Sequence, residues 1–585
     1  MCGIIGYVGE KNATPILFDC LRKLEYRGYD SYGFATIYKG RIWIRKSKGK
    51  VSEGGFEKLP GHLGIAHTRW ATHGKVSKAN AHPHMDCERR VAIIHNGIIE
   101  NFESIRKDLA RKGHKLISDT DSEVVSHLIE DNMDLGLEEA VRRTMKILKG
   151  RSAILVMKDD FEGIIAARNG SPLIVGVGKG DYFIASDVPA FLSRTKNVMY
   201  LDDGEMVVIE RRKKPAFFDI QNGRNVEKRI IRIEWDAKHA EKGAYEHFMI
   251  KEIMEQKETI VRAINQNDQN IRKVAGEIAK AYGVFLTGCG TAGNVCHTGE
   301  YIFSSVAKKH VNYVVASEFP NYKEFLTKKT LLITVSQSGE TADVLEAVKA
   351  AKVKRVKVIS LINVRGSSLD RMSDFTFLIN AGPEKAVAST KATTAQLAVL
   401  YLLAYACSGR LDDGKRLLLE TASKINDMLN PRYEERIKNL ARVIHKKRDI
   451  YVIGRSLNYP MAMETALKIM EVSYIHAHGF AGGELKHGPI ALIEKNIPCI
   501  VLTDGETDQD IISNAMEVKA RGGFIIGIGP RKHEAFDFWI KTPDVGLASP
   551  IVNIIPIQLL AYHLGVTRGC AVDTPRHLAK AVTVK

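Results

Sequence analysis

The second half of the chain contains an internal repeat, which strongly limits the folds available to it. Gly288 in VFLTGCG and Gly454 in YVIGRS end apolar segments that lie 166 residues apart. Gly339 in SQSGETADV and Gly505 in LTDGETDQD have the same spacing. Two matches at one offset are typical of a duplicated structural unit. We therefore expect two tandem copies of one domain after about residue 240.

Within each copy, apolar segments alternate with helical patterns. The segments VFLTG, LLITVS and VKVISL have the composition of buried strands, and a long helix is expected at about 390–406. Such alternation indicates a parallel sheet with crossover helices. We predict two doubly wound α/β domains, at residues 248–424 and 425–575, and a C-terminal tail at 576–585.

The first 235 residues follow a different pattern, in which short strands occur in runs. Strand segments are expected at 4–8, 33–38, 42–45, 91–94, 153–157 and 206–209, with helices at 122–130 and 137–148. Runs of strands with turns rich in Gly and Asn indicate a layered antiparallel α+β domain. Charge rises and apolar content falls through 210–242, so we place this domain at 2–238 and a linker at 239–247.

The composition argues against several classes of protein. Hydrophobic residues make up 45% and charged residues 26%, and we find no apolar run near the ~20 residues of a membrane span. The N-terminus lacks the pattern of a secretion signal. The net charge of +17 is spread along the chain without a nucleic-acid-binding motif. We expect neither nucleic acid nor a membrane as a partner.

The cysteines indicate a reducing environment. Eight are scattered along the chain and none forms a Cys-x-x-Cys pair, which argues against a structural zinc site. So many scattered thiols favour a cytoplasmic location. We expect no metal and no cofactor.

Cys2 directly follows the initiator methionine. If Met1 is removed, Cys2 carries a thiol and a free α-amine whose pKa is typically ~7.7–8.0. Such an amine can accept the thiol proton, directly or through a water, and release a thiolate nucleophile. The alternative is a small strand residue buried near a chain end.

Further segments supply the groups that a glutamine substrate requires. Glutamine presents a carboxylate, an ammonium and an amide, so its site needs a cation, an anion and hydrogen-bond donors near the thiol. Arg69 in GIAHTRWATHG supplies the cation and Asp121 in TDSEV the anion. Asn96 and Gly97 in IHNGIIEN suit an oxyanion hole. Taken singly each is commonplace, since Asn-Gly is usually a turn.

Together these segments resemble the class II glutamine amidotransferase domain with an N-terminal nucleophile. The similar stretches, in order, are MCGIIGYVG, LEYRGYDSYG, GIAHTRWATHG, NAHPH, HNGIIEN and SDTDSEV. The resemblance implies that Cys2 attacks the amide to form a glutamyl thioester, while Asn96 and Gly97 stabilise the oxyanion. It implies a glutamine-binding set of Arg69, Trp70, Thr72, His73 and Asp121, with Arg27 and His82 in supporting roles. Trp70 has the alternative of a packed core aromatic.

The segment LLITVSQSGETADVLEAVKAAK indicates a strand, a loop and a helix with a phosphate site at the turn. A helix N-terminus offers unpaired N–H groups and partial positive charge. The predicted phosphate ligands are Ser336, Gln337, Ser338 and Thr341. The alternative is plain helix capping by a hydroxyl side chain, with Glu340 in the first turn. In the second copy Asp504 replaces Ser338 and would repel phosphate, so we expect only the first copy to bind one.

The helix expected near 461–474 is apolar on nearly every side but carries Glu464, Lys468 and Glu471 on one stripe. Burying three charges is costly unless they pair or act in chemistry. The stripe is therefore either a self-satisfied ion pair or an acid/base group facing a sugar. His487 in ELKHGP and Lys580 near the C-terminus would, by position alone, be solvated.

The second half resembles the sugar-isomerase domain pair of the glutamine–fructose-6-phosphate aminotransferase family. The similar motifs are FLTGCGTAGN, SQSGETAD, NVRGSSL, VASTKA, ELKHGP and DTPRHLAKAVTVK. The resemblance implies transfer of ammonia from glutamine to fructose-6-phosphate and isomerisation to glucosamine-6-phosphate, the first step of hexosamine synthesis. It also implies a dry internal passage for ammonia and a homodimer formed through the sugar-isomerase domains.

The resemblance also implies residue roles in this half. Lys580 would form a Schiff base with the open-chain ketose, Glu471 would move a proton between C1 and C2, and His487 from a second subunit would assist ring opening. Lys468 and Glu464 would support them. Expected sugar contacts are Thr291, Val387 and Ser389. The chain departs from the family in having Ala292 where serine is usual and His478 where an acidic residue is frequent.

Two other functions fit the same motifs. One is an amidotransferase or deglycase acting on another phosphosugar, which would use both halves with a different acceptor. The other is a non-enzymatic phosphosugar-binding regulator, against which the intact Cys2 and Lys580 argue.

Overall fold

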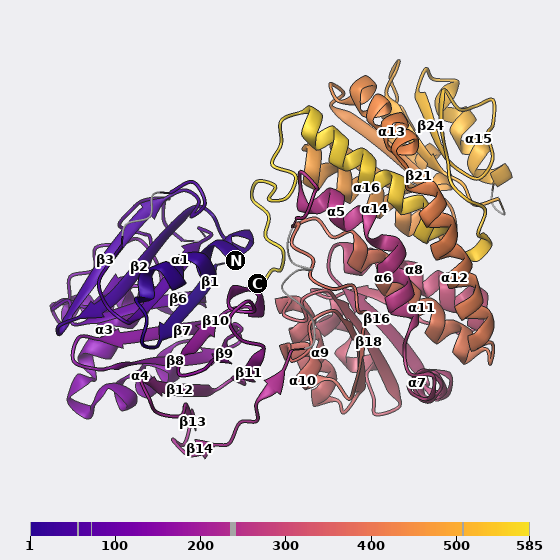
Figure 1. Cartoon of the computed structure of the whole chain (residues 1–585). Coiled ribbons are helices and arrows are strands. Elements are labelled where there is room, and N and C mark those ends of the chain that lie inside the picture. The colour runs from indigo at the N-terminus through magenta and orange to yellow at the C-terminus, as the bar shows by residue number, and fades with distance from the viewer. Residues whose placement is uncertain (1, 55–57, 72, 234–241, 506–507, 584–585) are drawn as a thin grey trace. The chain divides into compact units, whose positions relative to one another are not determined.

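The computed structural model describes residues 2–54, 58–71, 73–233, 242–505 and 508–583 (Figure 1). Two compact units form, one from Met1–Glu241 with Ala579–Lys585 and the other from Lys242–Leu578. Residues 239–241 of the predicted linker lie outside the described residues.

The N-terminal unit is built on two antiparallel sheets. One has eight strands in the order β15 (Ile231–Arg232), β11 (Asn197–Tyr200), β9 (Ile174–Val177), β10 (Tyr182–Ala185), β1 (Gly3–Val8), β4 (Leu63–Arg69), β2 (Ser31–Tyr38) and β3 (Arg41–Lys48). The other has seven, in the order β14 (Asn225–Val226), β13 (Ala216–Asp219), β12 (Glu205–Glu210), β8 (Gly163–Asn169), β7 (Gly150–Lys158), β6 (Val91–Ile99) and β5 (His84–Met85).

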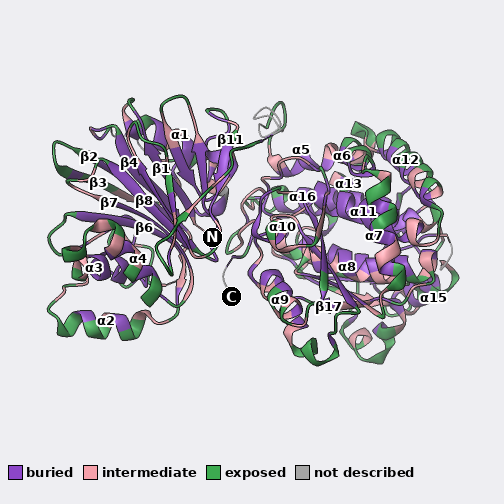
Figure 2. Cartoon of the chain, turned by 90° about the horizontal axis from the view of Figure 1, so that it is seen from below, coloured by how far each residue is buried: buried purple, intermediate pink, exposed green. Residues whose placement is uncertain are grey.

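Helices cover the outer faces of these sheets, so the unit has four layers. Helix α1 (Ala13–Lys23) packs on β1 and β4, while α3 (Val124–Asp131) and α4 (Leu137–Ile147) pack on β6 and β8. Helix α2 (Phe102–Arg111) buries only Ile105 and Leu109, and Figure 2 shows much of it exposed. Between the sheets, Ile4, Ile65 and Leu155 are fully buried, because alternate side chains of each strand point to the same face.

The C-terminal unit contains two parallel five-stranded sheets of identical topology. The first has the order β17 (Asn312–Val315), β16 (Gly283–Gly288), β18 (Thr330–Ser336), β19 (Lys357–Ile362) and β20 (Phe375–Leu378). The second has the order β22 (His476–Ala481), β21 (Asp449–Gly454), β23 (Pro498–Leu502), β24 (Phe524–Gly529) and β25 (Phe538–Lys541). This is a doubly wound order. The repeat and both predicted fold classes are confirmed.

Helices α5–α16 surround the two sheets, which share one apolar core. Their bounds are α5 (Phe248–Met254), α6 (Gln256–Ile264), α7 (Asp268–Lys280), α8 (Thr291–Ile302), α9 (Ala342–Val353), α10 (Ser368–Met372), α11 (Lys391–Cys407), α12 (Leu411–Met428), α13 (Pro431–Ile444), α14 (Asn458–Ser473), α15 (Asp508–Lys519) and α16 (Ser549–Thr567). The helices expected near 390–406 and 461–474 are α11 and α14.

Helix α16 corrects the expectation that the chain lacks an apolar run of membrane-spanning length. A window of 18 residues within Gly546–Thr567 has a mean hydropathy of 1.4, and this 22-residue stretch is long and apolar enough to cross a membrane by length and composition. However, 94% of its apolar window is buried inside the protein, where α16 packs against α14 and α13. A helix that is apolar on all sides is the normal element for such a core position.

The repeated glycine that ends β21 is required by packing. A Cβ built on Gly454 would lie 2.1 Å from the carbonyl oxygen of Asn458. We predict that Gly454→Ala destabilises the chain by about 1–3 kcal/mol, since overpacking against backbone has no cheap relief. Gly276→Ala in α7 is the matched control, because its added methyl meets nothing within 4 Å and removes a helical glycine. Urea unfolding of both variants measures the difference; equal stability of the two would contradict this interpretation.

Candidate active sites

Cys2 directly precedes β1 in the N-terminal unit and contacts a residue that follows β4 of one sheet and a residue in β6 of the other. The pairing of β1 with β4 sets Gly3 opposite Thr68. The Trp70 amide donates to Cys2 Sγ at 3.2 Å, and Sγ donates to Trp70 O at 3.6 Å. From the other sheet, Asn96 Nδ2 donates to the Cys2 carbonyl at 2.9 Å. Main-chain pairing thus brings the thiol and the predicted oxyanion-hole residue together.

The Cys2 thiol is flanked by a cation and an anion. Burial raises the pKa of Cys2, the Arg69 guanidinium acts to lower it, and the Asp121 carboxylate to raise it. Arg69 and Asp121 are both buried, at 3% exposure each. Since its pKa is raised, this thiol requires a base to become a thiolate.

Main-chain contacts fix the two charged groups. Arg69 donates to the carbonyls of Gly74 and Lys75, each at 3.2 Å, and to that of His73. Asp121 Oδ2 accepts from the Ile99 amide at 2.9 Å. A buried guanidinium beside a buried carboxylate matches the carboxylate and ammonium ends of free glutamine.

His67, to which the sequence analysis assigned no role, orients Asn96. Its Nε2 lies 3.1 Å from Asn96 Oδ1 and 3.0 Å from His95 O, and burial lowers the pKa of His67 to about 3. A neutral imidazole facing two acceptors carries its proton on Nε2, so Asn96 Oδ1 accepts and Nδ2 is directed to Cys2. The ring of His82 stacks on His67 with centroids 4.0 Å apart. The alternation of polar residues in GIAHTRW is the sequence feature from which a role for His67 could have been predicted.

The other predicted glutamine-site residues have distinct positions. Gly97 has φ +129°, and a Cβ there would lie 1.8 Å from Arg151 O. Trp70 is half-buried beside the thiol, and the His73 ring packs edge-on against Phe102 at 5.4 Å. Thr72 lies outside the described residues.

Arg27 contacts the Cys2 carbonyl as well. It pairs with Asp187 at 2.9 Å and donates to Cys2 O at 3.5 Å, so the Cys2 carbonyl has two donors, Asn96 and Arg27.

The predicted phosphate loop follows β18 in the C-terminal unit. Ser336 Oγ accepts from the Gly339 amide at 3.0 Å and lies 3.2 Å from Thr341 Oγ1. Ser338 Oγ accepts from the Glu340 amide at 3.1 Å. Gly339 has φ +66°, and a Cβ there would lie 2.1 Å from Ser367 Oγ. The loop is a tight turn that gathers hydroxyls at the start of α9.

The helix-capping alternative for this loop receives no support from Thr341. This residue occupies the N-cap of α9, but its side chain makes no capping hydrogen bond. Its hydroxyl faces Ser336, and Gln337 is half-buried. The N-terminal amides of α9 therefore keep the ability to bind an anion.

The charged stripe of α14 forms a buried network. Glu464 Oε1 accepts from Thr291 Oγ1 at 3.0 Å and Oε2 from Asn294 Nδ2 at 2.8 Å, both from α8. Lys468 lies 3.5 Å from Glu464 and also pairs with Glu471. Glu464 and Lys468 have side chains 0% exposed, whereas Glu471 is 21% exposed.

The ion-pair interpretation of the α14 stripe therefore fits Glu464 and Lys468, and the acid/base interpretation fits Glu471. Burial raises the pKa of Glu464; burial lowers the pKa of Lys468, but Glu471 and Glu464 act against it and leave it raised. Glu464 and Lys468 satisfy each other. Glu471, which retains exposed surface, is the member able to exchange a proton with a bound molecule. Thr291, expected to touch sugar, instead donates to Glu464 here.

The loop before α11 lies beside this stripe. Glu384 accepts from the Ser389 hydroxyl at 3.2 Å and the Thr390 amide at 2.9 Å, and its charge also acts on Lys468. The Val387 amide donates to Asp573 O at 2.9 Å. Val387 and Ser389 are thus tied to the network and to the segment that leads to the tail.

The remaining predicted residues lie on other segments. His487 ends a short 3₁₀ helix, Gly482–His487, and is exposed. Lys580 is half-buried on Ala579–Lys585, which groups with the N-terminal unit. Ala292 is half-buried in the first turn of α8, and His478 is exposed on β22. Glu506 and Thr507 of the second-copy loop lie outside the described residues.

Removing the Asn96 amide tests the oxyanion assignment. We predict that Asn96→Ala lowers kcat for glutamine hydrolysis by about 10²–10³-fold while KM for glutamine changes little. Asn222→Ala, in an exposed turn, is the control. Steady-state glutaminase kinetics give both constants; an unchanged kcat would contradict the assignment.

Removing the ammonium group of Lys468 tests whether it stabilises the buried carboxylates of the α14 network. We predict that Lys468→Met costs about 3–5 kcal/mol, since it leaves buried carboxylates uncompensated. Lys438→Met is the control, because Lys438 is 43% exposed in a 3.9 Å pair and should cost less than about 1 kcal/mol.

The loss of folding stability in Lys468→Met is expected to depend on pH. The pKa of Lys468 is raised in the folded state, so its contribution is complete below the unfolded value of about 10.4 and is lost as pH rises through the folded value. Denaturant unfolding at several pH values would show the deficit of Lys468→Met narrowing above about pH 10.4. A deficit that stayed constant there would contradict the network.

Comparison with known proteins agrees with the two units. A model described as a glutamine amidotransferase domain matches residues 67–193, and one described as a SIS domain matches 277–406 and 443–567. The C-terminal domain of glucosamine-fructose-6-phosphate aminotransferase from Francisella tularensis has 32% identity and a TM-score of 0.53, covering 57% of this chain and 100% of its own.

Curated relatives match over the full length. The glutamine–fructose-6-phosphate aminotransferase (isomerizing) of Pyrococcus horikoshii is 44% identical over 599 residues, and that of Thermococcus kodakarensis is 42% identical over 603. Both alignments cover 100% of this chain and 100% of the relative. The resemblance inferred from the motifs is confirmed. The chain belongs to the family of isomerising glutamine–fructose-6-phosphate aminotransferases.

Proposed function

We propose that this enzyme transfers ammonia from glutamine to fructose-6-phosphate and isomerises the product to glucosamine-6-phosphate, releasing glutamate. The observation that carries the proposal is the half-buried Cys2 thiol, whose pKa is affected by the charges of Arg69 and Asp121, with Asn96 donating to the same residue. The full-length similarity to enzymes named for this reaction supports the choice of acceptor.

The first half-reaction requires that Met1 has already been removed from the chain. The freed α-amine of Cys2 accepts the thiol proton. A base is needed here because the pKa of the thiol is raised. The thiolate attacks the side-chain amide carbon, and Asn96 Nδ2, which has two hydrogens, donates to the oxyanion together with the Gly97 amide. The protonated α-amine of Cys2 returns its proton to the leaving nitrogen, so collapse of this intermediate expels ammonia and leaves a thioester, which water cleaves to glutamate and the free thiol. Arg69 and Asp121 bind the carboxylate and ammonium of glutamine, with Trp70, Thr72 and His73 lining the pocket.

The second half-reaction uses the C-terminal unit. The phosphate binds Ser336, Gln337, Ser338 and Thr341, and the sugar contacts Thr291, Val387 and Ser389. Lys580 forms an imine at C2 of the open-chain ketose, and ammonia displaces the lysine to give a fructosimine. Glu471 removes a proton from C1 while the imine nitrogen gains one, which gives an enolamine. It then delivers a proton to C2, while the C1 hydroxyl loses its proton and becomes the aldehyde. Lys468 and Glu464 hold Glu471 in place.

The setting and assembly are also proposals. All eight cysteines are free thiols, which supports a cytoplasmic enzyme. We propose a homodimer through the sugar-isomerase domains, with ammonia passing between the sites along a dry passage. The exposure of His487 on its own chain supports its use by a partner subunit in ring opening. Neither nucleic acid nor a membrane is proposed as a partner.

Separate loss of the two half-reactions tests the proposal. The native chain should form glucosamine-6-phosphate from glutamine and fructose-6-phosphate, whereas Cys2→Ala should lose at least about 10³-fold of the glutamine-dependent rate because no thiolate forms. Cys2→Ala should retain synthesis from concentrated free ammonia, and Cys407→Ala is the control thiol. Product assay decides: no glucosamine-6-phosphate from the native chain would favour another acceptor, and loss of the ammonia reaction in Cys2→Ala would contradict two separate sites.

The imine assignment has its own test. Borohydride reduction in the presence of fructose-6-phosphate should add the sugar covalently to the native chain, and peptide mass spectrometry should locate it on Lys580. Lys580→Ala should abolish the adduct, while Lys438→Ala should not. An adduct persisting in Lys580→Ala would identify a different lysine.

A further inference from the structure

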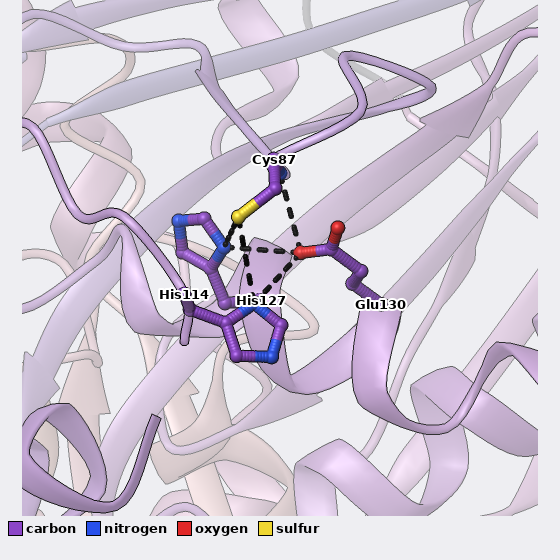
Figure 3. Close-up of side chains that lie close together, drawn as sticks. All are labelled: Cys87, His114, His127 and Glu130. Carbon is purple, nitrogen blue, oxygen red and sulfur yellow. Dashed lines mark hydrogen bonds and ion pairs between the residues drawn. The ribbon is translucent and has the colours of Figure 1, made fainter. Parts of the chain in front are cut away.

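Four side chains in the N-terminal unit direct ligand atoms toward one another (Figure 3). Cys87 lies on the loop between β5 and β6, His114 follows α2, and His127 and Glu130 lie on α3. The last two are three residues apart and so share one helix face. One ligand atom from each residue lies within 4.8 Å of the other three. None of these residues takes part in the Cys2 site.

Four of the six distances among the ligand atoms are close to the edges of a metal-centred tetrahedron, and the other two are at most 4.8 Å. Cys87 Sγ lies 3.6 Å from His114 Nδ1 and 3.5 Å from His127 Nδ1. With zinc bonds of about 2.3 Å to sulfur and about 2.0–2.1 Å to nitrogen and oxygen, a tetrahedron has edges of about 3.3–3.6 Å. Glu130 Oε2 lies 3.0 Å from His114 Nδ1 and 3.1 Å from His127 Nδ1. Those two edges need to lengthen by only about 0.2–0.3 Å.

A carboxylate behind the His114 imidazole provides an independent observation. His114 Nε2 lies 2.7 Å from Asp131 Oδ1, within hydrogen-bonding distance, whereas His127 Nε2 lies 3.9 Å from Glu123 Oε1, beyond hydrogen-bonding distance. Glu123 is itself fixed by the amides of Ile117 and Ser118, at 2.9 and 2.7 Å. A carboxylate on the outer nitrogen of a metal-binding histidine is the usual second layer of a metal site, because it turns the inner nitrogen toward the ion.

We propose that Cys87, His114, His127 and Glu130 bind one Zn²⁺ ion in a structural site. A thiolate with two imidazoles selects a borderline-soft transition metal over Mg²⁺ or Ca²⁺. Four protein ligands close the coordination shell, which is typical of structural rather than catalytic zinc. The Cys87 thiol releases its proton when the ion binds.

The ion would join three segments that lie up to 43 residues apart in the chain. It would tie the β5–β6 loop and the turn after α2 to α3, which begins just after Asp121. Its effect is therefore on the stability of the part of the fold that carries a glutamine-binding residue. This site could not be predicted from the sequence, because its ligand spacing matches none of the paired Cys or His patterns of known zinc motifs. The proposal replaces the expectation that the chain binds no metal.

Without an ion, the same groups would form a hydrogen-bonded cluster. Glu130 Oε2 also lies 3.2 Å from the Cys87 amide and so can accept from several donors. The two arrangements differ in whether Cys87 Sγ is required for tight binding of a metal. The proposal does not depend on the amidotransferase activity, so its failure would leave the proposed function intact.

Metal content of the full-length chain tests the proposal. The native chain, Cys87→Ser and the control Cys407→Ser are loaded with Zn²⁺ under reducing conditions, gel-filtered and analysed by mass spectrometry for metals. Cys407 is a half-buried thiol in the C-terminal unit. We expect about one zinc per chain in the native protein and in Cys407→Ser, and less than about a tenth of that in Cys87→Ser. Equal zinc in all three, or none in the native chain, would overturn the proposal.

Two further measurements cover the case in which Cys87→Ser folds poorly. Titration with Co²⁺ should produce a thiolate-to-metal absorption band in the native chain, and Asp131→Asn, which keeps all four ligands, should weaken cobalt binding by about 10–100-fold. Chelation should lower the thermal unfolding midpoint of the native chain but not that of Cys87→Ser. No cobalt–thiolate band, or a midpoint insensitive to chelator in the native chain, would contradict a structural metal site.

Discussion

The pairing of β1 with β4 is the constraint on which the glutamine site depends. Its register sets Gly3 opposite Thr68 and so holds Cys2 beside Trp70 and Arg69. Because a strand fixes the position of every residue along it, the nucleophile needs no loop of its own to place it. The second sheet then supplies Asn96 to the Cys2 carbonyl. Contacts from Trp70, which follows β4, and from Asn96 thereby hold Cys2, whose amine is proposed to act as the base once Met1 is removed.

The C-terminal unit shows how one domain, used twice, produces a site with two kinds of chemistry. Both copies have the same strand order, but the loop after β18 gathers hydroxyls whereas the equivalent loop of the second copy begins with Asp504. The second copy instead contributes α14, whose buried Glu464 is held by Thr291 and Asn294 from the first copy. In the proposed mechanism, anion binding and proton transfer are divided between the copies, and the network between α8 and α14 links them.

Much of this architecture could be predicted because it depends on local pattern. The repeat of Gly288 and Gly454 fixed the number of α/β domains, and Gly454 is required where its strand meets α14. Cys2 was recognisable because its chemistry depends on its position next to the initiator. Strand and helix segments were recognisable because periodicity reflects which face is buried.

Other features depend on contacts between distant segments, which no spacing reveals. The role of His67 follows from its contact with Asn96, 29 residues later. Thr341 had the sequence of a helix cap, yet its hydroxyl faces Ser336 instead of the helix amides. The cluster around Cys87 arises only when the β5–β6 loop meets α3. In each case the partners are selected by tertiary packing and not by neighbours in the sequence.

The central claim is that the Cys2 α-amine activates the Cys2 thiol, whose pKa burial raises. The most direct test is intact-mass analysis of the purified enzyme combined with its glutaminase activity per mole of chain. The account predicts that activity is proportional to the fraction of chains that begin at Cys2. Full activity in a preparation whose chains all retain Met1 would contradict it.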